Sequence, residues 1–119
     1  MQTPTIERIK RQIANNSVLL YMKGTPDFPM CGFSSRVTHI LNSLNAQYAY
    51  VNILENPDIR AELPQYAKWP TFPQLYIQGE LVGGCDIVVE LHKNEELKPM
   101  LAAVQALLPA KAEAVLAQD

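Results

Sequence analysis

A single cysteine stands where a Cys-x-x-Cys redox motif would carry two. Cys31 is followed three positions later by Ser34, whose hydroxyl neither ionises near neutral pH nor forms a bond to sulfur, so no disulfide can close within the motif. The simplest role of Ser34 is to support the start of a helix. A reactive thiol without a second cysteine has two main uses, exchange with an external thiol or coordination of a soft metal ion. The motif alone leaves both open.

Cys31 is predicted to be a reactive thiol. Residues 24–29, which precede it, form a loop containing Gly and Pro between an apolar strand and a helix that begins near Gly32. The unpaired amides and the macrodipole of a helix N-terminus stabilise an anion, and Lys23 adds positive charge nearby. A small packed side chain is the commoner fate of a free cysteine, but an exposed loop before Cys31 favours reactivity.

Two further segments are candidates for a binding site. Pro73 is expected at the entrance of a strand, where the preceding backbone is left free to pair with an extended peptide, and a cis bond at Phe72-Pro73 fits this context. Residues 83–86, Gly-Gly-Cys-Asp, predict a second helix start whose glycines let a ligand approach the backbone. Asp86 is equally well explained as a helix N-cap, and Cys85 is expected to be a packed thiol.

Alternating helices and strands must position these residues. Apolar periodicity and turn residues predict the elements. The predicted helices run from Pro4 past Ile13, over about 32–44, over 56–67 and over 86–107. Phe33 is expected on the apolar stripe of the second helix, and the last helix is expected to be interrupted near Pro99. The predicted strands cover 17–22, 48–54, 73–77 and 80–84.

The order of these elements predicts an α/β fold. Strands separated by helices favour parallel pairing, whereas the last two strands, joined at Gln78-Gly79, must be antiparallel. We therefore expect a four-stranded mixed sheet flanked by helices on both faces. Residues 1–108 are expected to form this domain, and the Ala-rich tail, 109–119, is expected to be a frayed helix or disordered.

Composition excludes several classes of partner. The chain has 119 residues, 48% hydrophobic and 18% charged, which is typical of one globular domain. A net charge of −2 and a pI near 5.6 give no electrostatic reason to expect nucleic acid or an anionic membrane surface. No apolar run approaches the ~20 residues that span a bilayer, and no signal peptide is evident. We therefore expect a cytoplasmic protein whose two cysteines are free thiols.

Taken together, the motifs resemble those of the monothiol glutaredoxins of the CGFS type. The matching segments are Lys23, Gly24-Thr25-Pro26, Cys31-Gly32-Phe33-Ser34, Trp69-Pro70-Thr71-Phe72-Pro73 and Gly83-Gly84-Cys85-Asp86. The resemblance runs in register over roughly Thr5 to Leu107 and looks closest to the bacterial single-domain members. It implies a thioredoxin fold, glutathione as a ligand and a 2Fe-2S cluster that bridges two subunits.

The same resemblance implies a role for each site residue. Cys31 would be the redox-active thiol and the ligand of the cluster. Lys23 and Arg60, otherwise readable as solvated charges, would hold the glycine carboxylate of glutathione. The other predicted glutathione-site residues are Thr71, Phe72, Pro73, Gly84, Cys85 and Asp86, and Trp69, Gly32 and Phe33 would help to shape the pocket. Among these, the amides of Cys85 and Asp86 would receive the γ-glutamyl carboxylate.

Counting ligands suggests how such a cluster would be held. A 2Fe-2S cluster normally takes four thiolates, and each chain offers one thiol in a suitable setting. Two chains and two glutathione molecules would supply four, so the protein would be a homodimer with the cluster and a monomer without it. Its expected role is assembly, storage or transfer of clusters to recipient apo iron-sulfur proteins. Two alternatives use the same site: slow glutathione-dependent thiol-disulfide exchange, and a cluster-dependent regulatory adaptor with a BolA-like partner.

Overall fold

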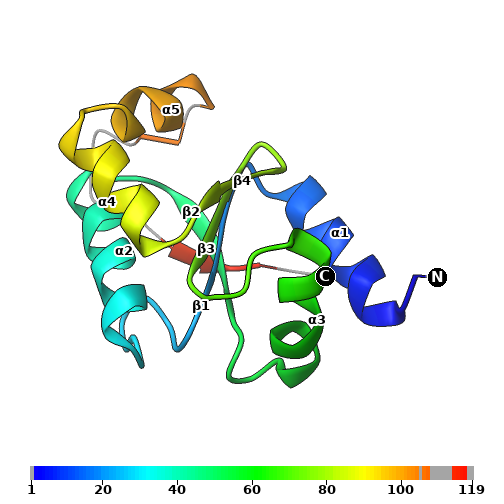
Figure 1. Ribbon diagram of the computed structural model, residues 1–119. Helices are drawn as coiled ribbons and strands as arrows, with labels where there is room; N and C mark the ends of the chain where they lie inside the picture. The colour runs from blue at the N-terminus through cyan, green and yellow to red at the C-terminus, as the bar shows by residue number, and fades with distance from the viewer. Residues whose placement is uncertain (1, 105, 108–113, 118–119) are drawn as a thin grey trace.

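The computed structural model describes residues 2–104, 106–107 and 114–117, and in these residues helices and strands alternate as far as the third strand (Figure 1). The helices are α1 (Pro4–Asn15), α2 (Gly32–Ser43), α3 (Pro57–Ala67), α4 (Cys85–Lys93) and α5 (Leu97–Ala103). The strands are β1 (Val18–Met22), β2 (Tyr48–Asn52), β3 (Gln74–Ile77), β4 (Glu80–Gly83) and β5 (Ala114–Leu116). The first four strands agree with the prediction to within a few residues.

The strands form one mixed sheet in the order β4-β3-β1-β2-β5. β1 and β2 are parallel, while β3 is antiparallel to both β1 and β4. Gln78 and Gly79 connect β3 to β4 with φ of 52° and 80°, the left-handed backbone of a tight hairpin turn. The predicted crossover pairing and the predicted final hairpin are therefore both confirmed.

The fifth strand corrects the prediction of a four-stranded sheet. β5 pairs in parallel with Tyr48–Tyr50 of β2, although the sequence predicts a frayed helix or disorder for this part of the tail. Three residues are too few to show strand periodicity, and this strand exists because it can pair with the open edge of β2, which is distant in sequence. Residues 109–113 and 118–119, the rest of the predicted tail, lie outside the described residues.

Two hydrophobic layers hold helices against the two faces of the sheet. In β1, Leu20 and Met22 pack toward α2, α4 and α5, whereas Leu19 and Tyr21 pack toward α1 and α3. This alternation is the period of two expected for a strand. Figure 1 shows the resulting arrangement, with the sheet between the two groups of helices. Within the described residues, no helix is long and apolar enough to cross a membrane.

The predicted interruption of the last helix is displaced. The chain leaves the helical path at residues 94–96, where Glu95 has a φ of 59°, and not at Pro99. Pro99 lies in the first turn of α5. An amide is not needed for a helical hydrogen bond at that position, so proline is tolerated there.

Candidate functional site

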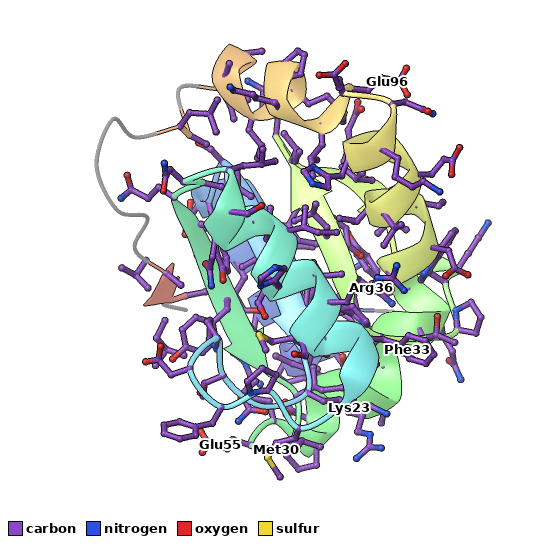
Figure 2. All side chains as sticks on the ribbon, turned by 90° about the vertical axis from the view of Figure 1, so that its left-hand side faces the viewer. Lys23, Met30, Phe33, Arg36, Glu55 and Glu96 are labelled. Atoms are coloured by element: carbon purple, nitrogen blue, oxygen red, sulfur yellow. The ribbon has the colours of Figure 1, made fainter. Side chains whose placement is uncertain are left out.

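Cys31 is the N-cap residue of α2, at the end of the molecule where Figure 2 labels Lys23, Met30 and Phe33. Its backbone is extended, with φ of −150° and ψ of 151°, and its Sγ accepts a hydrogen bond from the amide of Ser34 over 3.4 Å. A cap of this kind satisfies one of the free amides at a helix start. The thiol is half-buried, and it therefore combines a helix start with access from solvent.

The surroundings of Cys31 favour its thiolate. Burial alone would raise the pKa of the thiol, but the amide and hydroxyl of Ser34, the amide of Phe33 and the charge of Lys23 together hold that pKa below its ordinary value. Hydrogen bonds to the charged form and a nearby cation stabilise an anion. The sequence-based prediction of an easily ionised thiol therefore agrees with the geometry.

Ser34 does more than support the start of α2, the role that the sequence predicts for it. Its side chain is fully buried, its Oγ accepts a hydrogen bond from the Lys23 amide over 3.1 Å, and the Cys31 thiol lies 3.5 Å from the same oxygen. When the thiol ionises, the hydroxyl proton can turn toward sulfur. Ser34 thus connects the end of β1 to the sulfur of Cys31.

The loop before Cys31 is fixed by a buried asparagine that sequence reasoning missed. The Oδ1 atom of Asn52, at the end of β2, accepts hydrogen bonds from the amides of Gly24 and Leu54 at 2.9 and 3.0 Å. Gly24 has a φ of +95°, and a Cβ there would lie 2.5 Å from the Phe28 carbonyl oxygen, so only glycine fits. These contacts fix the loop that carries the exposed side chains of Phe28 and Met30 before Cys31.

A cavity of about 240 Å³ lies where three loops meet, before α2, β3 and α4. Its lining residues are Phe33, Trp69, Thr71, Phe72, Gly84, Cys85, Asp86 and Ile87. The Phe33 side chain is 63% exposed and forms part of this wall, which agrees with its predicted part in shaping the pocket and differs from its predicted place on the apolar stripe of the helix. Phe33 lies in the first turn of α2, before the buried residues of the helix, which begin at Ser34. Ile87 was not predicted, because an apolar residue in a helix carries no signal for a site.

Gly84 is in tight contact with the opposite wall of the cavity. A Cβ at this position would lie 3.2 Å from the Pro73 carbonyl oxygen and 3.3 Å from Trp69 Nε1. Trp69 Nε1 is buried and has no hydrogen-bond partner among the described residues. The glycine therefore lets the start of α4 approach the tryptophan closely, as the sequence predicts for a glycine pair at a binding site.

The helix start at Cys85 differs from the predicted one. The N-cap is Gly84, and Asp86 lies inside the first turn of α4, so the prediction of Asp86 as N-cap is wrong, although its carboxylate still complements the helix dipole. Cys85 is 8% exposed, as expected for a packed thiol. Burial raises its pKa, the charge of Arg36 opposes that rise, and the charges of Asp86 and Cys31 add to it.

Four of the predicted site residues, Cys31, Lys23, Arg60 and Pro73, are not among those that line the cavity. Lys23 is half-buried and acts electrostatically on Cys31, while Pro73 is buried behind the cavity wall. The Phe72-Pro73 bond is cis, as the sequence suggested. Within the described part of the chain, no hydrogen bond uses the amide or carbonyl of Phe72. Arg60 is exposed on α3 and does not line the cavity.

Comparison with known proteins gives relatives of one family. A family model, Glutaredoxin, matches residues 18–82. Glutaredoxin 4 of Escherichia coli strain K12 is 58% identical over 102 residues, which cover 86% of this chain and 89% of that protein. Glutaredoxin 4 of Pasteurella multocida strain Pm70 is 55% identical over 105 residues, which cover 88% of this chain and 96% of that protein.

Solved structures agree as well. A buckwheat glutaredoxin in complex with glutathione superposes with a TM-score of 0.77 at 28% identity, over 87% of this chain and 93% of that one. Reduced apo GrxS14 from poplar superposes with a TM-score of 0.70 at 52% identity, over 82% of this chain and 89% of that one. These matches confirm the predicted thioredoxin fold. The chain belongs to the glutaredoxin family and resembles its Glutaredoxin 4 members, as the sequence motifs predict.

Proposed function

We propose that this glutaredoxin binds glutathione in the cavity beside Cys31 and uses that thiolate to hold a 2Fe-2S cluster between two subunits. In this role the protein carries clusters during their assembly, storage or transfer to recipient apo iron-sulfur proteins. The proposal is supported most directly by one observation: the site has one thiol with a lowered pKa, and a buried serine hydroxyl takes the position of a second thiol.

The chemistry of the cavity suits glutathione, a tripeptide with two carboxylates, one ammonium group and one thiol. The first amides of α4 can donate hydrogen bonds to a carboxylate, and the side chain of Asp86 can pair with an ammonium group. The Phe72 backbone can pair with an extended peptide in the way that a strand edge does. Lys23 provides a cation near the thiol. The buckwheat relative was solved as a glutathione complex, which supports the same ligand here.

The donor set explains why a cluster would need ligands from outside the chain. Among the described residues, no three His, Cys, Asp or Glu side chains gather where they could hold a metal ion. Cys31 is the accessible thiolate, and Cys85 is packed with a raised pKa. A cluster with four thiolate ligands therefore fits this site if a second chain and glutathione contribute. Because half of its ligands would be diffusible, such a cluster would be labile cargo.

Reconstitution tests this function. The apo protein is incubated anaerobically with iron and sulfide, with and without glutathione, and then examined by absorbance, size-exclusion chromatography and native mass spectrometry. The expected product with glutathione is a coloured dimer with two irons and two glutathiones per pair of chains. Without glutathione, or after chelation, a colourless monomer is expected, because ligands shared between subunits link cluster binding to dimerisation. A cluster-loaded dimer that contains no glutathione would contradict the proposal.

Thiol-disulfide exchange is a second candidate function, favoured by the lowered pKa of Cys31. Glutathione bound to Cys31 as a mixed disulfide must be released by a second glutathione, because Ser34 cannot attack it. We expect slow turnover of a glutathionylated substrate. Turnover as fast as that of an efficient dithiol glutaredoxin would make thiol-disulfide exchange the leading function.

A regulatory adaptor with a BolA-like partner would use the same cluster. Mixing the cluster-loaded dimer with such a partner would test this role, because a heterodimer should then form.

A further inference from the structure

Gln74 is a fully buried glutamine that holds the cavity wall from behind. Its Nε2 atom donates hydrogen bonds to the carbonyl oxygens of Trp69 and Thr71, at 3.1 and 3.2 Å. Its Oε1 atom accepts a hydrogen bond from the Tyr76 hydroxyl at 2.9 Å. Both amide protons and the amide oxygen are therefore used, and the side chain is fixed in one orientation.

The two carbonyls held by Gln74 belong to a segment without regular secondary structure. Trp69 and Thr71 both line the cavity, and the chain between α3 and β3 forms neither a helix nor a strand. At its start this segment is held by a hydrogen bond from the Trp69 amide to the Pro64 carbonyl. Gln74 supplies the side-chain bonds that connect the segment to the sheet. The shape of this wall thus depends on one buried amide.

A second buried glutamine provides an internal comparison. Gln12, on α1, accepts a hydrogen bond from the Tyr21 hydroxyl over 2.8 Å. The rings of Tyr21 and Tyr76 meet edge to face, with centroids 5.7 Å apart and an angle of 80° between their planes. The two glutamine-tyrosine pairs therefore share one hydrophobic layer. They differ in position, because Gln74 bonds to carbonyls of residues in the cavity wall and Gln12 lies on α1, away from the cavity.

We infer that Gln74 is a positioning residue for glutathione: it fixes the segment 69–71, so that the wall of the cavity and the adjacent Phe72 backbone are already in their binding conformation before the ligand arrives. The inference rests on the glutathione site proposed above. A wall that must be ordered during binding reduces affinity, because the cost of ordering is taken from the binding free energy. Loss of Gln74 should therefore weaken glutathione binding more than loss of a buried glutamine away from the cavity does.

The test compares Gln74→Met with Gln12→Met in the full chain. Methionine is unbranched and of similar length, so it fills the space but makes none of the hydrogen bonds. Trp69 is the single tryptophan of the chain and lines the cavity, so its fluorescence reports binding. S-methylglutathione, which cannot form a disulfide, is titrated into each protein, and urea unfolding gives the stability of each.

We expect the Kd of Gln74→Met for S-methylglutathione to rise at least tenfold, and that of Gln12→Met to stay within about twofold of the wild type. Both variants should lose stability, since each removes a hydrogen bond to the hydroxyl of a buried tyrosine. The Trp69 emission of the ligand-free protein should shift only in Gln74→Met. If that variant does not fold, Gln74→Asn, whose shorter side chain cannot reach both carbonyls, is judged by the same criterion.

The outcomes separate this inference from the proposed function. A wild-type protein that does not respond to S-methylglutathione would overturn the glutathione site, and the inference with it. A wild-type protein that binds, together with a Kd for the Gln74 variant less than fivefold above that of Gln12→Met, would overturn the positioning role alone. A ratio of fivefold or more supports it.

Discussion

The two cysteines of this protein both lie at the start of a helix, but their thiols are shifted in opposite directions. The pKa of Cys31 is lowered and that of Cys85 is raised. Cys31 is the N-cap residue of α2, so its Sγ lies where the amide of Ser34 can donate to it. Cys85 is the first residue inside α4. Burial is the largest single influence on both thiols, and hydrogen bonds offset it only at Cys31.

This difference shows that a helix start alone does not make a thiol reactive. Amides at a helix start stabilise a thiolate when they donate to it, and burial destabilises the same charge when no donor compensates. The amides and hydroxyl that donate to the sulfur of Cys31, and that have no counterpart at Cys85, decide which effect is larger. The functional contrast proposed above, with one thiol as cluster ligand and the other as part of a cavity wall, is consistent with this difference.

The largest expected effect is loss of the cluster in Cys31→Ser. This variant should show no visible absorbance and no bound iron after anaerobic reconstitution with glutathione, because it removes the thiolate that each subunit would contribute. Circular dichroism should show an unchanged fold. The matched variant Cys85→Ser should retain the cluster. Equal loss of colour in both variants would show that the roles of the two thiols have been assigned wrongly.

Ser34→Ala should have the next largest effect, because it removes the hydroxyl that distinguishes the surroundings of the two thiols. The Lys23 amide would lose this part-buried hydrogen bond, at a cost of about 0.5–1.5 kcal/mol. The pKa of Cys31 should rise, because a hydrogen bond to the thiolate is lost. The rate of alkylation by iodoacetamide as a function of pH would report that rise.

Ser35→Ala, at the exposed neighbouring position, is the control for this experiment. It should leave both the stability and the pH profile of alkylation unchanged, since the Ser35 side chain is not in the contact between β1 and Cys31. If Ser34→Ala alkylates with the same midpoint as the wild type, the hydroxyl has no influence on the thiol.

A smaller effect is expected from adding one methyl group at each helix start. Gly84→Ala should weaken glutathione binding severalfold, because the new Cβ would press on Trp69 and on the Pro73 carbonyl. Gly32→Ala is the matched change beside Cys31, and there a Cβ would meet nothing within 4 Å. Gly32→Ala should bind like the wild type and be equally or slightly more stable, since alanine is the better helix former. Equal affinities of the two variants, measured by Trp69 fluorescence, would show that the close approach at Gly84 does not matter for binding.

Much of this arrangement could be predicted because its signals are local in sequence. The strand before Cys31, the helix after it and the turn at Gln78-Gly79 all follow from periodicity and from residues with special backbone preferences. The motifs placed Thr71, Phe72 and residues 84–86 in one site, and the structure brings them around one cavity.

The missed features depend on contacts between residues far apart in sequence. Asn52 holds Gly24, 28 positions away, and a buried asparagine at the end of a strand does not indicate which loop it bonds. β5 forms on an edge that only the folded sheet creates. Gln74 looks like an ordinary strand residue until the path of the 69–71 segment is known. In each case the residues bond to a backbone group whose position in the folded chain the sequence does not reveal.

The smallest expected effect is a pH dependence of stability with opposite sign at the two thiols. A pKa that is lowered on folding, as at Cys31, adds stability when the thiol is ionised: this contribution is complete above the unfolded-state pKa and is lost as the pH falls through the folded-state value. A raised pKa, as at Cys85, adds stability that is present below the unfolded-state value and is lost as the pH rises. Urea unfolding of the wild type, Cys31→Ser and Cys85→Ser at pH 7 and pH 9.5 measures both contributions. From pH 7 to pH 9.5, the stability of the wild type relative to Cys31→Ser should increase, and that relative to Cys85→Ser should decrease. Changes of the same sign in both comparisons would contradict the assignment of one stabilised and one destabilised thiolate, because titrations of groups that neither thiol influences cancel in each difference.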